Sequence, residues 1–74
     1  MEVKEGQVYR HFKGHEYVIV RIGYDSETLE KLVIYESITD KKVWVRKHDN
    51  FISKVDHEKY PNVKQEYRFE LIHD

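Results

Sequence analysis

The sequence has no cysteine, one proline and three glycines among its 74 residues. Without cysteine, the chain can form neither a disulfide framework nor a metal centre with thiolate ligands. The longest apolar run, Tyr17 to Val20, is far shorter than the roughly 20 residues that a membrane-spanning helix needs. The opening segment MEVKEGQ is charged and lacks the apolar stretch of a secretory signal. We therefore expect a cytoplasmic protein that does not cross a membrane.

An excess of charge of one sign is also missing. Thirteen Lys and Arg residues oppose fourteen Asp and Glu residues, for a net charge of −1 with histidine neutral. Both signs are interspersed along the chain, which is typical of a solvated surface and gives no overall field toward nucleic acid or membrane. A local basic patch is still compatible with this balance.

Aromatic residues are plentiful for so short a chain. There are six Tyr, three Phe and one Trp, and each large ring can bury roughly 150–250 Å². A chain of this length buries only roughly 60% of its extended-chain surface. We therefore expect residues 1–74 to form one small domain whose core is closed by aromatic rings.

Short bursts of β-branched and aromatic residues alternate with turn residues, a pattern that predicts β-strands. The bursts cover residues 7–12, 16–22, 31–38, 43–46, 50–55 and 65–72. Between the last two lies a charged excursion, residues 56–64, which carries the only proline. Five to six short antiparallel strands cannot fill two sheets in so short a chain. The pattern therefore predicts an all-β fold, in which the sheet curls into a small, partly open barrel.

Several short motifs occur in a characteristic order: Gly6, Tyr9, His11-Phe12-Lys13-Gly14, Tyr17, Ser26-Glu27-Thr28, Glu30, Val33, Tyr35, Trp44-Val45-Arg46, Phe51, Pro61 and Arg68-Phe69. With these motifs the chain resembles the small bacterial domain-of-unknown-function family 1653 over nearly its whole length. The resemblance implies an SH3-like barrel and no particular activity. The sequence departs from the family pattern at Asp25, Lys47 and Asn50, where the family usually has His, Pro and Met.

The residues that could carry metal or catalytic chemistry do not converge in the sequence. His11 and His15 have the spacing of two ligands on one helical face, but Lys13-Gly14 predicts a turn between them. No third ligand joins them at a spacing suited to zinc. The glycines are isolated, so no phosphate-binding loop predicts a nucleotide. No thiol or activated serine is indicated. We expect no catalytic residues, no metal site and no cofactor.

A different combination, of rings and cations, defines the candidate binding site. Alternation along the first strand separates two faces. The apolar content of one predicts that it points to the core: Val8, Arg10 and Phe12. The other is then expected to face outward: Tyr9, His11 and Lys13. On the fourth strand, Trp44 and Arg46 share the face opposite Val43 and Val45.

Two interpretations of these residues stay open. If the two faces adjoin, Tyr9, His11, Lys13, Trp44 and Arg46 form a shelf that could bind by stacking, cation–π contact or bidentate recognition of a carboxylate or phosphate. Alternatively, Trp44 packs in the core and the others are ordinary surface residues. The motif 26–28 has a structural reading as well, as a turn whose side chains bond the backbone.

The combination favours a non-enzymatic binding module for a protein or peptide partner. We expect a monomer or a weak homodimer, since an exposed edge strand can pair two copies. A second hypothesis is nucleic-acid binding through a local basic patch: Arg10, Lys13, Lys41, Lys42, Arg46 and Lys47. A small enzyme or an enzyme accessory domain is the third.

Overall fold

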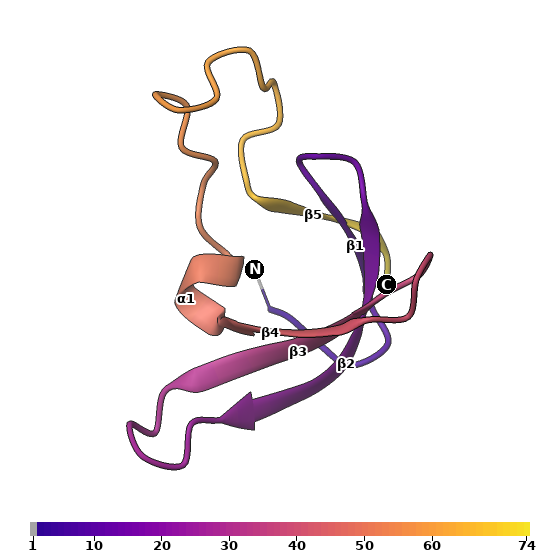
Figure 1. Ribbon diagram of the computed structural model, residues 1–74, viewed down its shortest axis with the longest axis vertical. Helices are drawn as coiled ribbons and strands as arrows, with labels where there is room; N and C mark the ends of the chain where they lie inside the picture. The colour runs from indigo at the N-terminus through magenta and orange to yellow at the C-terminus, as the bar shows by residue number, and fades with distance from the viewer. Residues whose placement is uncertain (1) are drawn as a thin grey trace.

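The computed structural model describes residues 2–74 and consists of one antiparallel sheet with almost no helix. The elements are β1 (Val8–His11), β2 (Glu16–Tyr24), β3 (Lys31–Ser37), β4 (Val43–Lys47), α1 (His48–Phe51) and β5 (Phe69–His73). The strand order is β4-β3-β2-β1-β5, so β2 is the middle strand of the sheet (Figure 1). The prediction of an all-β fold of five to six short antiparallel strands is confirmed, with five strands in the sheet. The sheet is not closed, so β4 and β5 are its two edges.

β2 is the longest strand, and it joins the two halves of the sheet. Residues 16–18 pair with β1, and residues 17–24 pair with β3, which places Ile19 opposite Tyr35 and Ile22 opposite Val33. The register shifts between Ile19 and Arg21. A bulge of this kind bends a strand and increases its twist. The sheet can therefore curl around one inner face.

The inner face carries a core made largely of aromatic rings, as the composition predicted. Its buried residues are Val3, Tyr9, Ile19, Val33, Tyr35, Phe51 and Phe69. Phe51 and Phe69 stack with ring centres 4.0 Å apart and an interplanar angle of 9°. Tyr9 and Tyr35 meet Phe51 edge-on, at 5.3 and 5.5 Å.

The predicted facing of β1 is wrong. Tyr9 was expected to face outward, but it has no exposed surface, and its hydroxyl donates to Gln7 Oε1 at 2.9 Å. Arg10 lies on the exposed face, where it pairs with Glu16 at 3.0 Å. β1 ends at His11, so Phe12 lies in the turn and does not follow the alternation. The core face of β1 is thus decided by the large ring of Tyr9, whose hydroxyl has a buried partner in Gln7, and not by the number of apolar residues on each face.

The predicted strand over residues 50–55 is also wrong. The chain forms the helical turn α1, whose Phe51 packs into the core, and then makes only a single bridge between Lys54 and Tyr67. A turn of helix lets the chain leave the edge strand β4 and still bring Phe51 onto Phe69. A continued extended strand would carry that side chain past the core.

The excursion is closed at its base by backbone hydrogen bonds. The amide of Val55 donates to Glu66 O at 2.9 Å, and the amide of Arg68 donates to Ser53 O at 3.0 Å. Figure 1 shows the excursion projecting from the sheet beside the turn between β1 and β2. The Phe12 and Tyr60 rings meet there, with centres 5.0 Å apart.

No helix among residues 2–74 is long and apolar enough to span a membrane.

Candidate functional site

Two adjoining hollows open on the inner side of the sheet, and we refer to them together as the cleft. The aromatic half has a volume of about 250 Å³ and is lined by His11, Lys13, His15, Tyr17, Tyr35, Trp44, Arg46 and Phe69. The cationic half has a volume of about 280 Å³ and is lined by His11, Phe12, Lys13, Arg46, Asp56, Lys59, Tyr60 and Arg68. The two halves share His11, Lys13 and Arg46.

Four of the five predicted site residues line this cleft. His11 and Lys13 come from β1 and its turn, and Trp44 and Arg46 come from the edge strand β4. The fifth, Tyr9, is buried in the core and is not part of the surface. Trp44 keeps 47% of its surface exposed, so it forms a wall of the cleft and not the centre of the core.

Arg46 is held in a fixed orientation by neutral groups. Its Nε donates to the Tyr35 hydroxyl at 3.1 Å, and its Nη1 donates to Asn50 Oδ1 at 2.7 Å. Its guanidinium carbon lies 5.1 Å from the centre of the Phe69 ring. These contacts position the planar head without neutralising its charge.

Arg68 and Lys13 bring two further cations to the cationic half. Arg68 Nε donates to the hydroxyl of Ser53 at 2.8 Å, again a neutral partner. Lys13 Nζ lies 5.5 Å from the centre of the Tyr60 ring, and Lys59 Nζ lies at the same distance. Tyr60 therefore carries two ammonium groups near one ring.

His11 lies where the two halves of the cleft meet, and burial together with the nearby cations lowers its pKa. Its Nδ1 accepts a hydrogen bond from the amide of Lys13 at 3.1 Å, which fixes the neutral ring with its proton on Nε2. Burial first, and then the charges of Arg46, Lys13 and Arg68, lower the pKa of His11 from 6.5 to about 4. His15 contributes in the same direction. His11 is thus an uncharged ring among cations at neutral pH.

The positive charge of the cationic half has little counter-charge. Asp56 is the only acidic residue among those that line it, and its Oδ1 accepts from the amides of Glu58 and Lys59 at 3.1 and 3.3 Å. Within residues 2–74, no carboxylate forms an ion pair with any of its four Lys and Arg residues: Lys13, Arg46, Lys59 and Arg68. In that same part of the chain, no three His, Asp or Glu residues cluster as metal ligands.

Sequence reasoning missed three residues that the excursion and the segment after it bring to the cleft. Lys59, Tyr60 and Arg68 lie far from β1 in the chain, and only the closure of the excursion places them beside it. Arg68 belongs to one of the motifs that carried the family resemblance, so its position in the pattern was the available signal. Lys59 and Tyr60 had no such signal.

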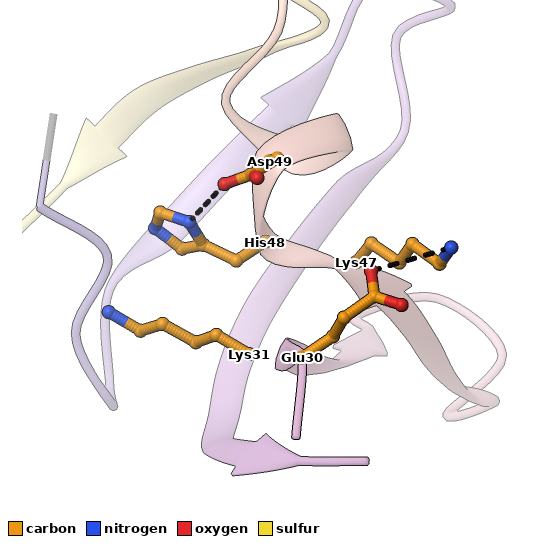
Figure 2. Close-up of a pocket in the computed structure, with 5 residues that line it drawn as sticks. All are labelled: Glu30, Lys31, Lys47, His48 and Asp49. Atoms are coloured by element: carbon orange, nitrogen blue, oxygen red, sulfur yellow. Dashed lines mark hydrogen bonds and ion pairs between the residues drawn. The ribbon is translucent and has the colours of Figure 1, made fainter. Parts of the chain in front are cut away.

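A third hollow, shown in Figure 2, lies at the far end of β4 and has a volume of about 170 Å³. It is lined by Glu30, Lys31, Lys47, His48 and Asp49. Lys47 pairs with Glu30 at 3.4 Å, and His48 meets Asp49 at 3.4 Å. Its Lys47 therefore has a carboxylate partner, in contrast to the cations of the cationic half of the cleft.

The predicted basic patch is not gathered on one surface. Lys47 belongs to the hollow of Figure 2, and Arg10 pairs with Glu16 on the outer face of β1. Lys13 and Arg46 are the two patch residues that line the cleft. Alternation along β4 explains the separation of Arg46 from Lys47, because successive side chains point to opposite faces.

The motif 26–28 forms a structural turn between β2 and β3, as its structural reading predicted. Asp25 Oδ1 accepts from the amides of Glu27 and Thr28 at 2.8 and 3.0 Å, and these bonds lower the pKa of the Asp25 carboxyl. Thr28 Oγ1 accepts from the amide of Glu30 at 3.2 Å. Asp25, one of the departures from the family pattern, therefore organises this turn.

The fold and the cleft define a small all-β domain with an aromatic and cationic concavity. The chain belongs to the family described as "Protein of unknown function (DUF1653)", whose model matches residues 7–71. The matched segment covers all five strands except the end of β5, and it covers every residue that lines the cleft. No curated protein and no solved structure matches the chain.

Proposed function

We propose that the domain is a non-enzymatic binding module that holds a segment of a partner protein in the cleft. One observation carries this proposal: side chains from β1, β4 and the excursion converge on an open concavity with aromatic walls. Open grooves lined by aromatic rings on small β-domains suit extended peptides, whose side chains can each make a shallow contact along the groove. The cysteine-free composition and the family resemblance favour a bacterial cytoplasmic setting.

The edge strand β4 supports a peptide as the bound segment. Trp44 and Arg46 line the cleft from this strand. Among residues 2–74, β4 has a strand partner only on its β3 side. Its other side presents main-chain amide and carbonyl groups that an added strand can pair with. An extended segment beside β4 would place alternate side chains in the cleft. The same edge is where two copies would pair in a weak homodimer.

Nucleic-acid binding is the second candidate, and the unpaired cations of the cleft favour it. Nucleic acid needs several phosphate contacts, and each such contact makes the affinity fall with salt. The balanced net charge of −1 argues against a strong electrostatic term. A nucleic-acid complex that weakens steeply as salt is raised would support this candidate over the peptide.

The test is capture of partners in the native cell with a tagged chain, by crosslinking followed by mass spectrometry and nucleic-acid recovery. A Trp44→Ala variant serves as the matched bait, since Trp44 is half-exposed and its loss should leave the fold intact. We expect a protein that is recovered by the wild type and lost with the variant. Recovery of the same proteins by both baits, or of nucleic acid alone, would contradict the proposal. Sizing of the pure protein then tests for self-association.

A further inference from the structure

We propose that the cationic half of the cleft is an oxyanion subsite, which takes an acidic side chain of the bound segment between Arg46 and Arg68. This inference rests on the proposed function and adds the chemistry of the ligand to it. The acidic group is a carboxylate, from Asp or Glu, or the phosphate of a modified side chain. Both present oxygen atoms that match the planar fork of a guanidinium.

Both arginines of the cleft are held by uncharged partners. Tyr35 and Asn50 orient Arg46, and Ser53 orients Arg68, and all three acceptors are uncharged. Both side chains are half-buried, so solvent screens them less than it screens exposed cations. Other arginines of the chain behave differently: Arg10 and Arg21 pair with carboxylates at 3.0 and 3.2 Å. The two cleft arginines are thus positioned while their charge is left available.

Two lysines surround the same hollow as the two arginines. Lys13 and Lys59 flank the same Tyr60 ring, and both line the hollow that Arg46 and Arg68 enter. Four cations around one hollow repel one another. An anion between them would offset this repulsion, and each charge-assisted hydrogen bond that it accepts is stronger than a neutral one.

His11 provides a built-in reporter of an anion in this hollow. It is faced by Arg46 from β4, by Lys13 and His15 from the turn between β1 and β2, and by Arg68 immediately before β5. These cations, together with burial, hold its pKa at about 4. The negative charge of a bound anion would offset these positive charges and favour the protonated imidazole, so it should raise the pKa of His11.

A peptide is favoured over nucleic acid as the source of the oxyanion. The subsite is a single hollow of about 280 Å³, and the basic residues Arg10 and Lys47 lie elsewhere, paired with carboxylates. Among residues 2–74, the structure therefore offers one such hollow for an anion and no continuous row of cations for successive phosphates. The adjacent edge strand offers main-chain pairing that only a polypeptide can use.

The experiment is an NMR titration of the full chain that follows the His11 ring and the side chains of Arg46 and Arg68. The probes are hexaglutamate and hexaglutamine with blocked ends, the hexaglutamine peptide with one phosphoserine in place of Gln, and a six-nucleotide oligothymidylate. We expect hexaglutamate to shift these signals and to raise the His11 pKa, and hexaglutamine to do neither. A stronger effect of the phosphoserine peptide would identify phosphate as the better oxyanion, and a weaker one would identify carboxylate.

Variants then place the anion in the hollow. Arg68→Gln should weaken hexaglutamate binding about tenfold or more, because it removes a charge-assisted hydrogen bond. Lys13→Gln removes an exposed cation whose side chain makes no hydrogen bond within residues 2–74, so it should fold normally and weaken binding about two- to fivefold. Lys64→Gln is the matched control: it removes one exposed cation outside the cleft, and it should change affinity less than about twofold.

Each opposite result overturns the subsite. Equal binding of hexaglutamate and hexaglutamine would show that the acidic side chains are not recognised. If both peptides shift only the NMR signals of Trp44, the domain binds peptides but has no oxyanion subsite. An equal loss with Lys64→Gln and Arg68→Gln would reduce the effect to net charge. Binding of the oligothymidylate with no response to hexaglutamate would overturn both the subsite and the peptide module.

Discussion

The guanidinium carbon of Arg46 lies 5.1 Å from the centre of the Phe69 ring, and that ring is fully buried. The same ring stacks on Phe51 at 4.0 Å. Phe69 is therefore part of the core and part of the cleft at once. The position of Arg46 depends on the packing of the domain, and a cation placed against a core ring is held more rigidly than one on a flexible loop.

Because of this arrangement, substitutions can change ligand binding without changing the stability of the fold only at the edges of the cleft. A change at Phe69 alters both. Changes that remove one polar atom, or one exposed ring, leave the stacked pair of Phe51 and Phe69 in place. The first two predictions use such changes.

Tyr35→Phe should loosen Arg46 without unfolding the domain. The substitution removes the hydroxyl that accepts from Arg46 Nε at 3.1 Å and leaves the ring in the core. We expect the free energy of unfolding to fall by about 0.5–1.5 kcal/mol, and the affinity for hexaglutamate to fall several-fold. Tyr17→Phe is the control, since the Tyr17 hydroxyl makes no hydrogen bond within residues 2–74 and its ring contacts Tyr35. Equal losses of unfolding free energy for the two variants in urea denaturation would show that the hydroxyl of Tyr35 does not hold Arg46.

Trp44→Ala should separate a wall of the cleft from the core. Because 47% of the Trp44 surface is exposed, we expect a loss of no more than about 1 kcal/mol in the free energy of unfolding. Phe51→Ala, at a fully buried ring, should cost about 3–5 kcal/mol and serves as the comparison. Urea denaturation measures both values. A loss for Trp44→Ala that approaches the loss for Phe51→Ala would make Trp44 a core residue, and the wall would then lie elsewhere.

The strands could be predicted from the sequence because their chemistry is local. Val33 and Tyr35 alternate with Leu32 and Ile34 along β3, and the first pair is the buried one. Alternation of this kind depends only on residues that are neighbours in the chain. The segment 50–55 has a similar composition, but its structure is decided by the need to bring Phe51 onto Phe69, a contact across the fold that the local pattern does not contain.

The site was predictable in part for the same reason. Trp44 and Arg46 share a face because they alternate with Val43 and Val45 on one strand. Tyr9 and His11 also share a face, but that face turned out to be the core side, with His11 at its open end. The contribution of the excursion depends on hydrogen bonds between residues 53–55 and 66–68. Such long-range closure cannot be derived from one sequence.

The turn at Leu29 offers a prediction about backbone strain. Leu29 has a positive φ of 66°, and 75% of its surface is exposed. The left-handed region disfavours a leucine, and Asn tolerates it better. We therefore expect Leu29→Asn to raise the free energy of unfolding by about 0.5–1 kcal/mol, measured by urea denaturation. The control is Thr28→Val, which removes the hydroxyl that accepts from the amide of Glu30 and should destabilise the same turn. Destabilisation by Leu29→Asn would mean that the leucine side chain makes a stabilising contact that its exposure does not suggest.

The last prediction concerns the dependence of stability on pH. The pKa of His11 is lowered from 6.5 to about 4 in the folded protein, first by burial and then by Arg46, Lys13 and Arg68. Between these two values the unfolded chain binds the proton and the folded chain does not. The free energy of unfolding contributed by His11 is therefore fully present above about pH 6.5 and is lost progressively as the pH falls toward 4.

Urea denaturation from about pH 7 to about pH 4 measures this slope. His11→Asn should flatten it, because Asn does not titrate there and its Oδ1 can still accept from the amide of Lys13. His73→Gln, which changes an exposed histidine outside the cleft, should leave the slope of the wild type. Asp25 and Asp40, whose pKa values are lowered by backbone hydrogen bonds, contribute stability that is lost below the window of His11. A slope that is the same in His11→Asn and the wild type would show that His11 does not titrate against the cations of the cleft, and the positive field inferred for the cationic half would lose its support.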